Sequence, residues 1–301
     1  MKKYFISVVL LLTLAACERT EDFPVGGSPF NGKCMAGRPI MQMRYDLHEE
    51  GVEASIDSLT IIDVWRWNSQ RQLTAVDYDT AGNYYRRALY TPFNDTYHYD
   101  GQGRLESIDC HGYIDRTCRF YYRNGLLSQI TYPFGNSDRQ YRTEFRYRSG
   151  SQYPYAVIFT HPQEDFMVEH YGDTVVQTWT LQWSDGNLAR ATADSTAWYW
   201  SGISQIDYYY DDHPNNLQGL FFTSQIFHDG FVNEPTSLCR NNLVRRVTHH
   251  SNHGETNSEE TLWNYTYGPD GYPTSVNYSY NTMYWTTVYV TNHITYGEFT
   301  K

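Results

Sequence analysis

Three histidines and a glutamate lie close together in the sequence and could ligate a metal ion. His249, His250 and His253 precede Glu255. Neutral imidazoles, helped by a carboxylate, could converge on Zn²⁺ or Cu²⁺ if one loop brought them together. The alternative is a solvated polar loop after the strand 243–247, because successive strand residues point to opposite faces. We interpret these residues as a polar loop and predict no metal and no other cofactor.

Hydrolysis by paired carboxylates is a second candidate chemistry. Glu164, Asp165 and Glu169 could supply the acid and the base of a glycoside hydrolase. Motifs whose spacing fixes a mechanism, such as His-Glu-x-x-His, Cys-x-x-Cys, Gly-x-Ser-x-Gly and the P-loop, do not occur in the sequence. A hydrolase or metal-dependent enzyme, with its site in loop 161–173 or loop 249–257, therefore stands as an alternative to a binding protein.

Aromatic side chains offer a third kind of site. The chain contains 29 Tyr, 14 Phe and 8 Trp. Consecutive aromatic residues at 198–200 and 208–210 must point to both faces of a strand, so one core face cannot bury them all. Either both faces are covered, or an exposed aromatic platform binds sugar rings or an extended peptide. The residues predicted to form such a platform are Trp65, Trp67, Trp198, Trp200, Tyr208 and Tyr210.

The elements that must position these residues are β-hairpins. In the stretch from Tyr97 to Ile108, two aromatic residues share one strand face, a Gly-rich turn follows, and an apolar return strand begins at Leu105. The pattern recurs along the chain at intervals of 23 to 36 residues. The second aromatic of each copy, or the cysteine of a degenerate copy, is Trp67, Tyr99, Tyr122, Tyr147, Trp183, Tyr210, Cys239 or Tyr267.

The return strands carry a spacing that a flat strand cannot accommodate. Leu105 and Ile108 are three residues apart, as are Leu73 and Val76, so a regular strand would place each pair on opposite faces. An extra residue near the turn would restore both side chains to one face, and we therefore predict a β-bulge in each hairpin. The predicted fold is all-β, with consecutive antiparallel hairpins forming a large twisted or curled sheet.

One copy of the hairpin resembles a known repeat. Residues 99–105, Tyr-Asp-Gly-Gln-Gly-Arg-Leu, match the core of the YD repeat of RHS-type cell-surface and toxin-shell proteins. The wider arrangement, over roughly residues 60–280, is similar to secreted bacterial lipoproteins of uncharacterised function that are built from such hairpins. The resemblance implies an extended or curled antiparallel sheet and no catalytic residues. The other copies depart from the Tyr-Asp pair.

The N-terminus resembles a bacterial lipoprotein signal. Lys2 and Lys3 precede an apolar run, which ends in Leu-Ala-Ala-Cys at Cys17. The resemblance implies a signal peptide over 1–16 and a diacylglyceryl group on Cys17; the alternative is an ordinary secretory peptide in which this cysteine is incidental. We predict a lipid-anchored linker over 17–38 and a single hairpin-repeat domain over 39–301, because residues 18–33 lack apolar periodicity.

The net charge of the chain excludes some classes of partner, and two of the later cysteines could form a disulfide. With 23 Lys and Arg against 34 Asp and Glu, nucleic acid and anionic membrane surfaces are not expected partners, so the lipid alone should hold the protein at the membrane. The acidic residues after Cys17 resemble the pattern that some Gram-negative lipoproteins use to reach the outer leaflet, which implies a place at the bacterial outer membrane. Cys110 and Cys118 bracket a plausible hairpin connection and are the predicted disulfide, with two free thiols as the alternative.

These features together predict a cell-envelope lipoprotein that acts as a binding module for a glycan or an extended peptide. A purely structural envelope component is the remaining alternative. The three interpretations differ in what the surface should show. Clustered exposed aromatic side chains favour binding, convergent carboxylates or histidines favour an enzyme, and neither favours a structural role.

Overall fold

The described part of the chain is one antiparallel β-sheet of sixteen strands. The computed structural model describes residues 35–47, 57–82, 94–111, 115–133, 140–162, 174–194, 202–221, 232, 235–252, 255–281 and 286–296. The strands are β1 (Met35–Leu47), β2 (Asp57–Trp67), β3 (Leu73–Gly82), β4 (Asn94–Tyr99), β5 (Leu105–His111), β6 (Arg116–Arg123), β7 (Leu126–Pro133), β8 (Gln140–Tyr147), β9 (Pro154–Pro162), β10 (Thr174–Ser184), β11 (Asn187–Ala193), β12 (Ile203–Pro214), β13 (Asn241–Asn252), β14 (Glu255–Tyr267), β15 (Pro273–Asn281) and β16 (Thr286–Tyr296).

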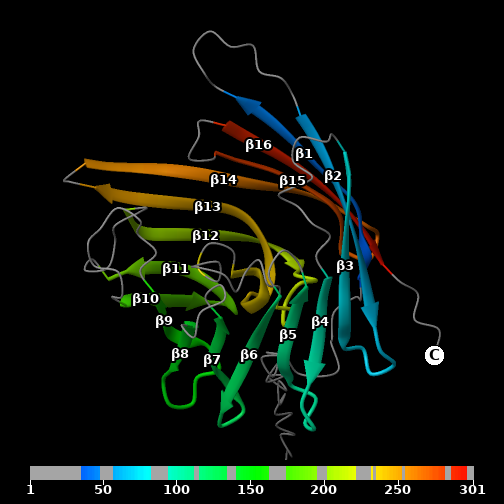
Figure 1. Cartoon of the computed structure of the whole chain (residues 1–301). Helices are drawn as coiled ribbons and strands as arrows, with labels where there is room; N and C mark the ends of the chain where they lie inside the picture. The colour runs from blue at the N-terminus through cyan, green and yellow to red at the C-terminus, as the bar shows by residue number, and fades with distance from the viewer. Residues whose placement is uncertain are drawn as a thin grey trace, which may run out of the picture.

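The order of the strands closes on itself. Strands that follow one another in the chain are neighbours in the sheet, and β1 pairs with both β2 and β16. Figure 1 shows the strands curving round from β3 through β6 and β10 to β14. The prediction of an all-β sheet of consecutive antiparallel hairpins is confirmed. Strand β1 also includes residues 35–38, which the sequence analysis had assigned to the linker.

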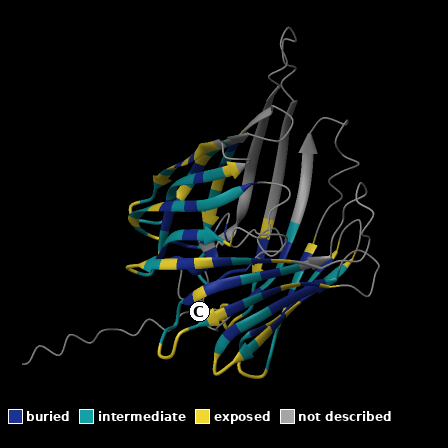
Figure 2. Cartoon of the chain, turned by 90° about the vertical axis from the view of Figure 1, so that its left-hand side faces the viewer, coloured by how far each residue is buried: buried dark blue, intermediate teal, exposed yellow. Residues whose placement is uncertain are grey.

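The two faces of this closed sheet differ in polarity. Buried side chains alternate along the strands with more exposed ones, as the bands of Figure 2 show. The buried set is mostly apolar and includes Ile108, Phe120, Ile130 and Trp179, which belong to one core cluster. Opposite-charge pairs such as Arg190 with Asp207 lie on the other face. Period-2 alternation therefore gives the sheet an apolar inner face and a polar outer face.

Each hairpin carries a bulge at the same place. In β3, Arg66 pairs with Ala75 but Trp67 pairs with Leu73, so Thr74 is an extra residue on the return strand. Both Leu73 and Val76 are buried as a result. The extra residues of the seven hairpins are Thr74, Glu106, Ser128, Tyr155, Ala189, Val244 and Thr274. The predicted bulge is confirmed, and it explains the three-residue spacing of apolar residues on the return strands.

The second aromatic of a hairpin ties it to the hairpin before it. The Tyr99 hydroxyl donates to the carbonyl oxygen of Leu73, at 2.8 Å. Because the bulge disturbs the ladder at the first residue of the return strand, a side-chain donor from the next hairpin can satisfy that carbonyl. The same contact is made by Tyr122 to Leu105 (2.9 Å), Tyr147 to Leu127 (2.9 Å), Trp183 to Pro154 (2.6 Å), Tyr210 to Leu188 (3.0 Å) and Tyr296 to Pro273 (2.7 Å).

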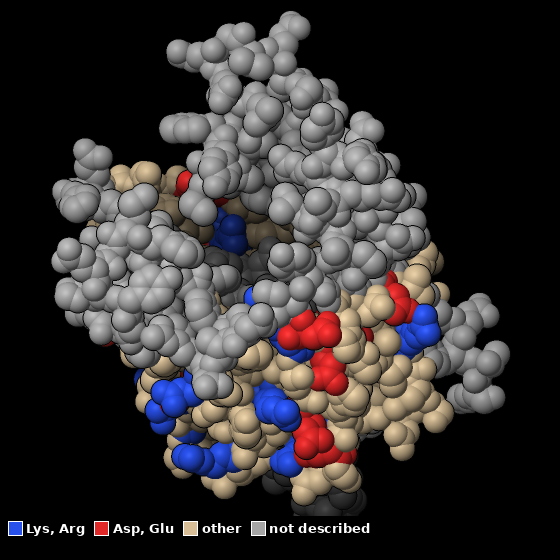
Figure 3. All heavy atoms as spheres, in the orientation of Figure 1, with Lys and Arg blue, Asp and Glu red and all other residues tan. Residues whose placement is uncertain are grey.

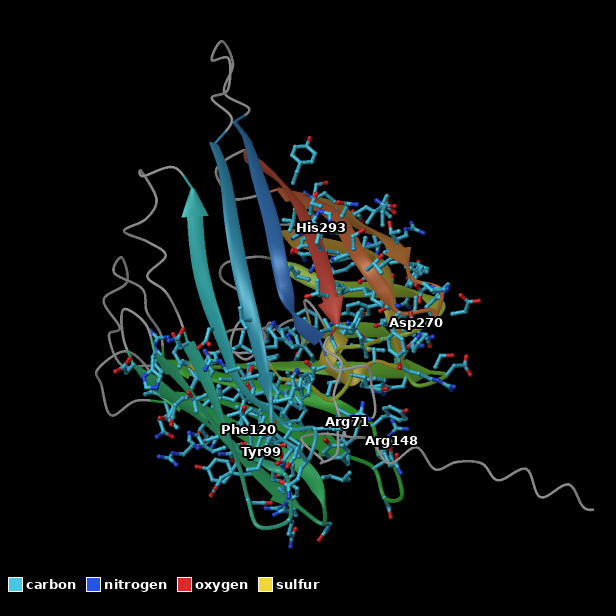
Figure 4. All side chains as sticks on the ribbon, turned by 90° about the vertical axis from the view of Figure 1, so that its right-hand side faces the viewer. Arg71, Tyr99, Phe120, Arg148, Asp270 and His293 are labelled. Atoms are coloured by element: carbon cyan, nitrogen blue, oxygen red, sulfur yellow. The ribbon has the colours of Figure 1, made fainter. Side chains whose placement is uncertain are left out.

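An aspartate closes the turn of the hairpin that matches the YD repeat. The Asp100 carboxylate accepts hydrogen bonds from the backbone N–H groups of Gln102 (2.8 Å) and Arg104 (2.9 Å). Gly103 supplies the left-handed conformation that the turn requires, with φ of 79°. Figure 4 labels Arg71, Arg148 and Asp270 of three other turns, which lie at the same end of the sheet.

The degenerate copy at Cys239 is not a hairpin of its own. Strand β13 is the return strand of β12, and residues 215–240 form a long connection between them, of which 215–221, 232 and 235–240 are described. It includes one turn of 3-10 helix, η2 (Pro235–Leu238). Phe221 from this connection packs against Phe120, with ring centroids 5.5 Å apart. The connection therefore contributes to the core that the inner face of the sheet encloses.

Within the described residues, no helix is long and apolar enough to cross a membrane.

Candidate functional site on the outer face of β12 to β14

The predicted aromatic residues mostly belong to the core. Trp65 and Tyr208 are buried. Trp67 and Tyr210 are partly buried and pack against the core cluster, and the Tyr210 hydroxyl also contacts Cys239 Sγ at 3.2 Å. Trp198 and Trp200 lie outside the described residues. Ligand binding through these side chains stays a prediction, and the exposed aromatic side chains that the structure describes are different ones.

The two cysteines predicted to pair are neighbours on the inner face. Cys110 and Cys118 are both buried and are free thiols in the structure. A hydrogen bond with the Cys118 thiol, together with burial, raises the pKa of Cys110 far above its usual value. Their disulfide stays a prediction, which the proximity of the thiols makes testable. Cys17 and Cys34 lie outside the described residues.

The histidines considered as metal ligands do not face one another. His249 and His250 are successive residues of β13, so their side chains point to opposite faces of the sheet. The Nε2 atom of His250 lies 3.8 Å from Glu259, whereas His249 bonds to other partners. His253 and the carboxylates of 161–173 after Pro162 fall outside the described ranges. Among described residues, no group of three His, Cys, Asp or Glu side chains is placed to hold a metal ion.

The outer faces of β12, β13 and β14 together form what we call the outer patch. Neighbouring positions of the three strands align in rows that run across the sheet. The rows are Tyr209, Arg245 and Leu262; Asp207, Val247 and Glu260; and Gln205, His249 and Ser258. The alternate residues Tyr208, Thr248 and Thr261 are buried, which identifies the rows as outward-facing.

The first row of the outer patch combines two exposed apolar side chains with an arginine. Tyr209 keeps 45% and Leu262 keeps 48% of its surface accessible. Between them, the Arg245 guanidinium lies over the Tyr209 ring, 4.6 Å from its centroid, and Arg245 Nε also bonds to Glu260. Cation–π stacking and the ion pair together hold Arg245 flat against the sheet. The row is therefore an ordered surface of one tyrosine, one arginine and one leucine.

The middle row contains a carboxylate, that of Asp207, which takes part in three hydrogen bonds. Asp207 accepts from Arg190 Nε at 2.5 Å, from Gln205 Nε2 at 2.9 Å and shares a 3.0 Å hydrogen bond with His249 Nε2. Partial burial opposes the charge on Asp207, but the hydrogen bonds from Arg190, Gln205 and His249 outweigh it and hold the pKa of Asp207 below its usual value. Asp207 is therefore an anion at neutral pH.

The third row extends this hydrogen-bond chain to a serine. Nδ1 of His249 lies 2.8 Å from Oγ of Ser258, and Nε2 of the same ring is bound to Asp207. Because an anionic carboxylate can only accept, Nε2 donates to Asp207, and in the neutral ring Nδ1 then accepts from the serine hydroxyl. His249 was a candidate from its neighbours in the sequence, whereas Asp207 and Ser258 were not predicted, because they reach His249 only through strand register.

Comparison with known proteins supports the fold and does not assign a family. No family model matches the chain, and no curated protein matches it. Among solved structures, a porin-like protein from Bacteroides uniformis has a TM-score of 0.52 and 11% identity, covering 86% of this chain and 98% of that chain. A porin-like protein from Bacteroides vulgatus (TM-score 0.36, 9% identity) covers 88% of this chain and 99% of that one. A TcdB2–TccC3 toxin structure (TM-score 0.27, 12% identity) covers 77% and 13%. The chain is thus an all-β antiparallel-sheet protein similar in fold to the Bacteroides uniformis protein.

Proposed function

We propose that this protein is a lipid-anchored interaction module of the bacterial cell envelope, which binds an extended peptide segment of a partner protein through the outer patch. The observation that carries the proposal is the exposed row of Tyr209, Arg245 and Leu262. Tyrosine and arginine are enriched at the energetic centres of protein interfaces, which a polar rim surrounds. Here the rim consists of the ion pairs of Asp207 and Glu260.

A peptide fits this surface better than a sugar ring does. A sugar binds by stacking on an open aromatic face, but the Arg245 guanidinium already covers one face of the Tyr209 ring. Addition of a peptide as an extra strand is disfavoured, because each of the sixteen described strands already has two neighbours. The partner peptide should therefore lie across the side chains of the patch. Figure 3 shows charged residues of both signs interspersed over another part of the surface, which is typical of a solvated face.

The peptide-binding role can be tested with paired variants. Tyr209→Ala combined with Leu262→Ser should lower binding to a peptide array by about tenfold or more, because both changes remove the apolar centre of the patch. Tyr121 on β6 is also exposed (45%), so Tyr121→Ala is a matched control that should leave binding unchanged. A glycan array tested in parallel distinguishes the other ligand class. Hits confined to glycans, or no hits on either array, would contradict the proposal.

The proposed location in the cell envelope rests on the N-terminal signal pattern, and the fold shared with a porin-like Bacteroides protein supports it. The anchor at Cys17 lies outside the described residues. Cys17→Ser removes the only sulfur that the lipid could modify at this site, so the variant should appear in the soluble fraction while the parent protein stays with membranes. Detergent-phase partitioning of both proteins measures this difference. Membrane retention of the serine variant would show that the lipid is not the anchor.

A further inference from the structure

The hydrogen-bond chain of the outer patch has the connectivity of a nucleophilic serine site. Ser258 contacts His249, and His249 contacts Asp207, at 2.8 Å and 3.0 Å respectively. Both distances lie within the range in which a base accepts a proton from a nucleophile and a third group orients that base. We infer that Ser258 is an activated nucleophile that is acylated by carboxylic esters, with His249 as the general base and Asp207 as the residue that positions His249.

Structural roles alone do not require this arrangement. Arg190 already neutralises Asp207 through a 2.5 Å contact, so His249 is not needed as the counter-ion of that carboxylate. The Asp207 contact instead sets which ring nitrogen of His249 is protonated, and the other nitrogen faces Ser258. Ser258 itself is exposed, so a reagent from solvent can reach its hydroxyl group.

Acylation of Ser258 by an ester, followed by hydrolysis, needs only Ser258, His249 and water to move the protons. The hydroxyl proton of Ser258 passes to Nδ1 of His249 while Oγ bonds to the ester carbonyl carbon. The bond from that carbon to the alkoxide then breaks, and the proton passes from Nδ1 to the leaving oxygen. Water hydrolyses the acyl-serine by the same route. Strand register places Ser251 and Thr256 opposite each other in the next outward row, which makes their hydroxyl groups the candidate donors to the developing oxyanion.

The substrate class follows from where the serine lies. Ser258 is on an exposed strand face, so the inferred substrates are esters of small acids, such as acetyl esters, whose carbonyl carbon is unhindered. This inference is independent of the peptide-binding proposal, which depends on Tyr209 and Leu262. Tyr209→Ala with Leu262→Ser should therefore leave acylation of Ser258 intact, and failure of one proposal does not affect the other.

A fluorophosphonate probe and p-nitrophenyl acetate test the nucleophile directly on the full chain. The probe should label Ser258, as located by peptide mass spectrometry, and the ester should add an acetyl group to the same residue with release of nitrophenolate. Ser258→Ala should abolish both reactions, and His249→Gln should slow them by about 10²- to 10⁴-fold. Circular dichroism of each variant checks that the sheet is intact.

Two further variants separate catalysis from structure. Ser275 lies opposite His293 on the neighbouring strands β15 and β16. Ser275→Ala therefore tests whether a serine opposite a histidine is by itself enough to react with the probe. It should leave labelling unchanged. Asp207→Asn should lower the maximal acylation rate, because the carboxylate that orients the His249 ring is gone. Absence of Ser258 labelling in a folded parent protein, or equal labelling of folded Ser258→Ala, would overturn the inference.

Discussion

Raising the pH above 10 should unfold this protein steeply, because buried tyrosines keep their protons only in the folded state. Burial raises the pKa of Tyr99, Tyr122, Tyr147 and Tyr210 well above 10, the value expected in the unfolded chain. Above that pH the unfolded chain therefore loses protons that the folded chain retains. Stability is present in full below pH 10 and falls as the pH rises.

The expected slope is large because the same contact is repeated. Each tyrosine that ionises only on unfolding lowers the unfolding free energy by about 1.4 kcal/mol per pH unit, so four together give about 5 kcal/mol per pH unit in the limit. Urea unfolding at pH 8, 10, 11 and 12 measures this slope. Tyr99→Phe should reduce it by about 1.4 kcal/mol per pH unit, whereas Phe at the exposed Tyr121 should not change it. A pH-independent stability up to pH 12 would contradict the burial of these hydroxyl groups.

The hairpin rule was predictable from the sequence, but its physical reason was not. Spacing alone indicated the paired aromatic residues, the turn and the bulge. The structure adds that the second aromatic of most hairpins donates a hydrogen bond to a backbone carbonyl of the hairpin before it, whereas Tyr267 donates to the Asp211 carboxylate. The sequence holds the signal, because the first aromatic can be Phe, as in Phe120 and Phe145, whereas in the seven bulged hairpins the second is Tyr or Trp. By this rule the segment ending at Tyr296 is a further copy, which the sequence analysis missed.

The contacts among Asp207, His249 and Ser258 could not be predicted from the sequence, for a geometrical reason. Alternation predicts which residues of one strand share a face, but not which residue lies opposite on the next strand. That register depends on the turns, and β12 and β13 are joined by the long connection 215–240. Asp207 and His249 are 42 residues apart, so no local pattern relates them. His249 was selected for its neighbours in sequence, yet its partners come from two other strands.

The position of the core tryptophan explains how the closed sheet is held together. Trp179 of β10 is fully buried and lies opposite Val157 of β9 and Ala193 of β11. The small side chain of Ala193 leaves room for the indole, so a single residue fills space over three strands. Replacing Trp179 with alanine removes this volume from the core and leaves a cavity that the surrounding side chains fill only in part.

Trp179→Ala should therefore lower the free energy of unfolding by about 3–5 kcal/mol, which combines the lost transfer energy of the indole with the cost of the cavity. The next residue, Thr180, points outward and is exposed, so Thr180→Ala is a matched control that should change stability by about 0.5 kcal/mol or less. Urea unfolding followed by tryptophan and tyrosine fluorescence measures both variants. A loss of less than about 1 kcal/mol for Trp179→Ala would mean that the strands around β10 do not depend on this side chain, and that the hydrogen bonds between successive hairpins carry the stability of the closed sheet.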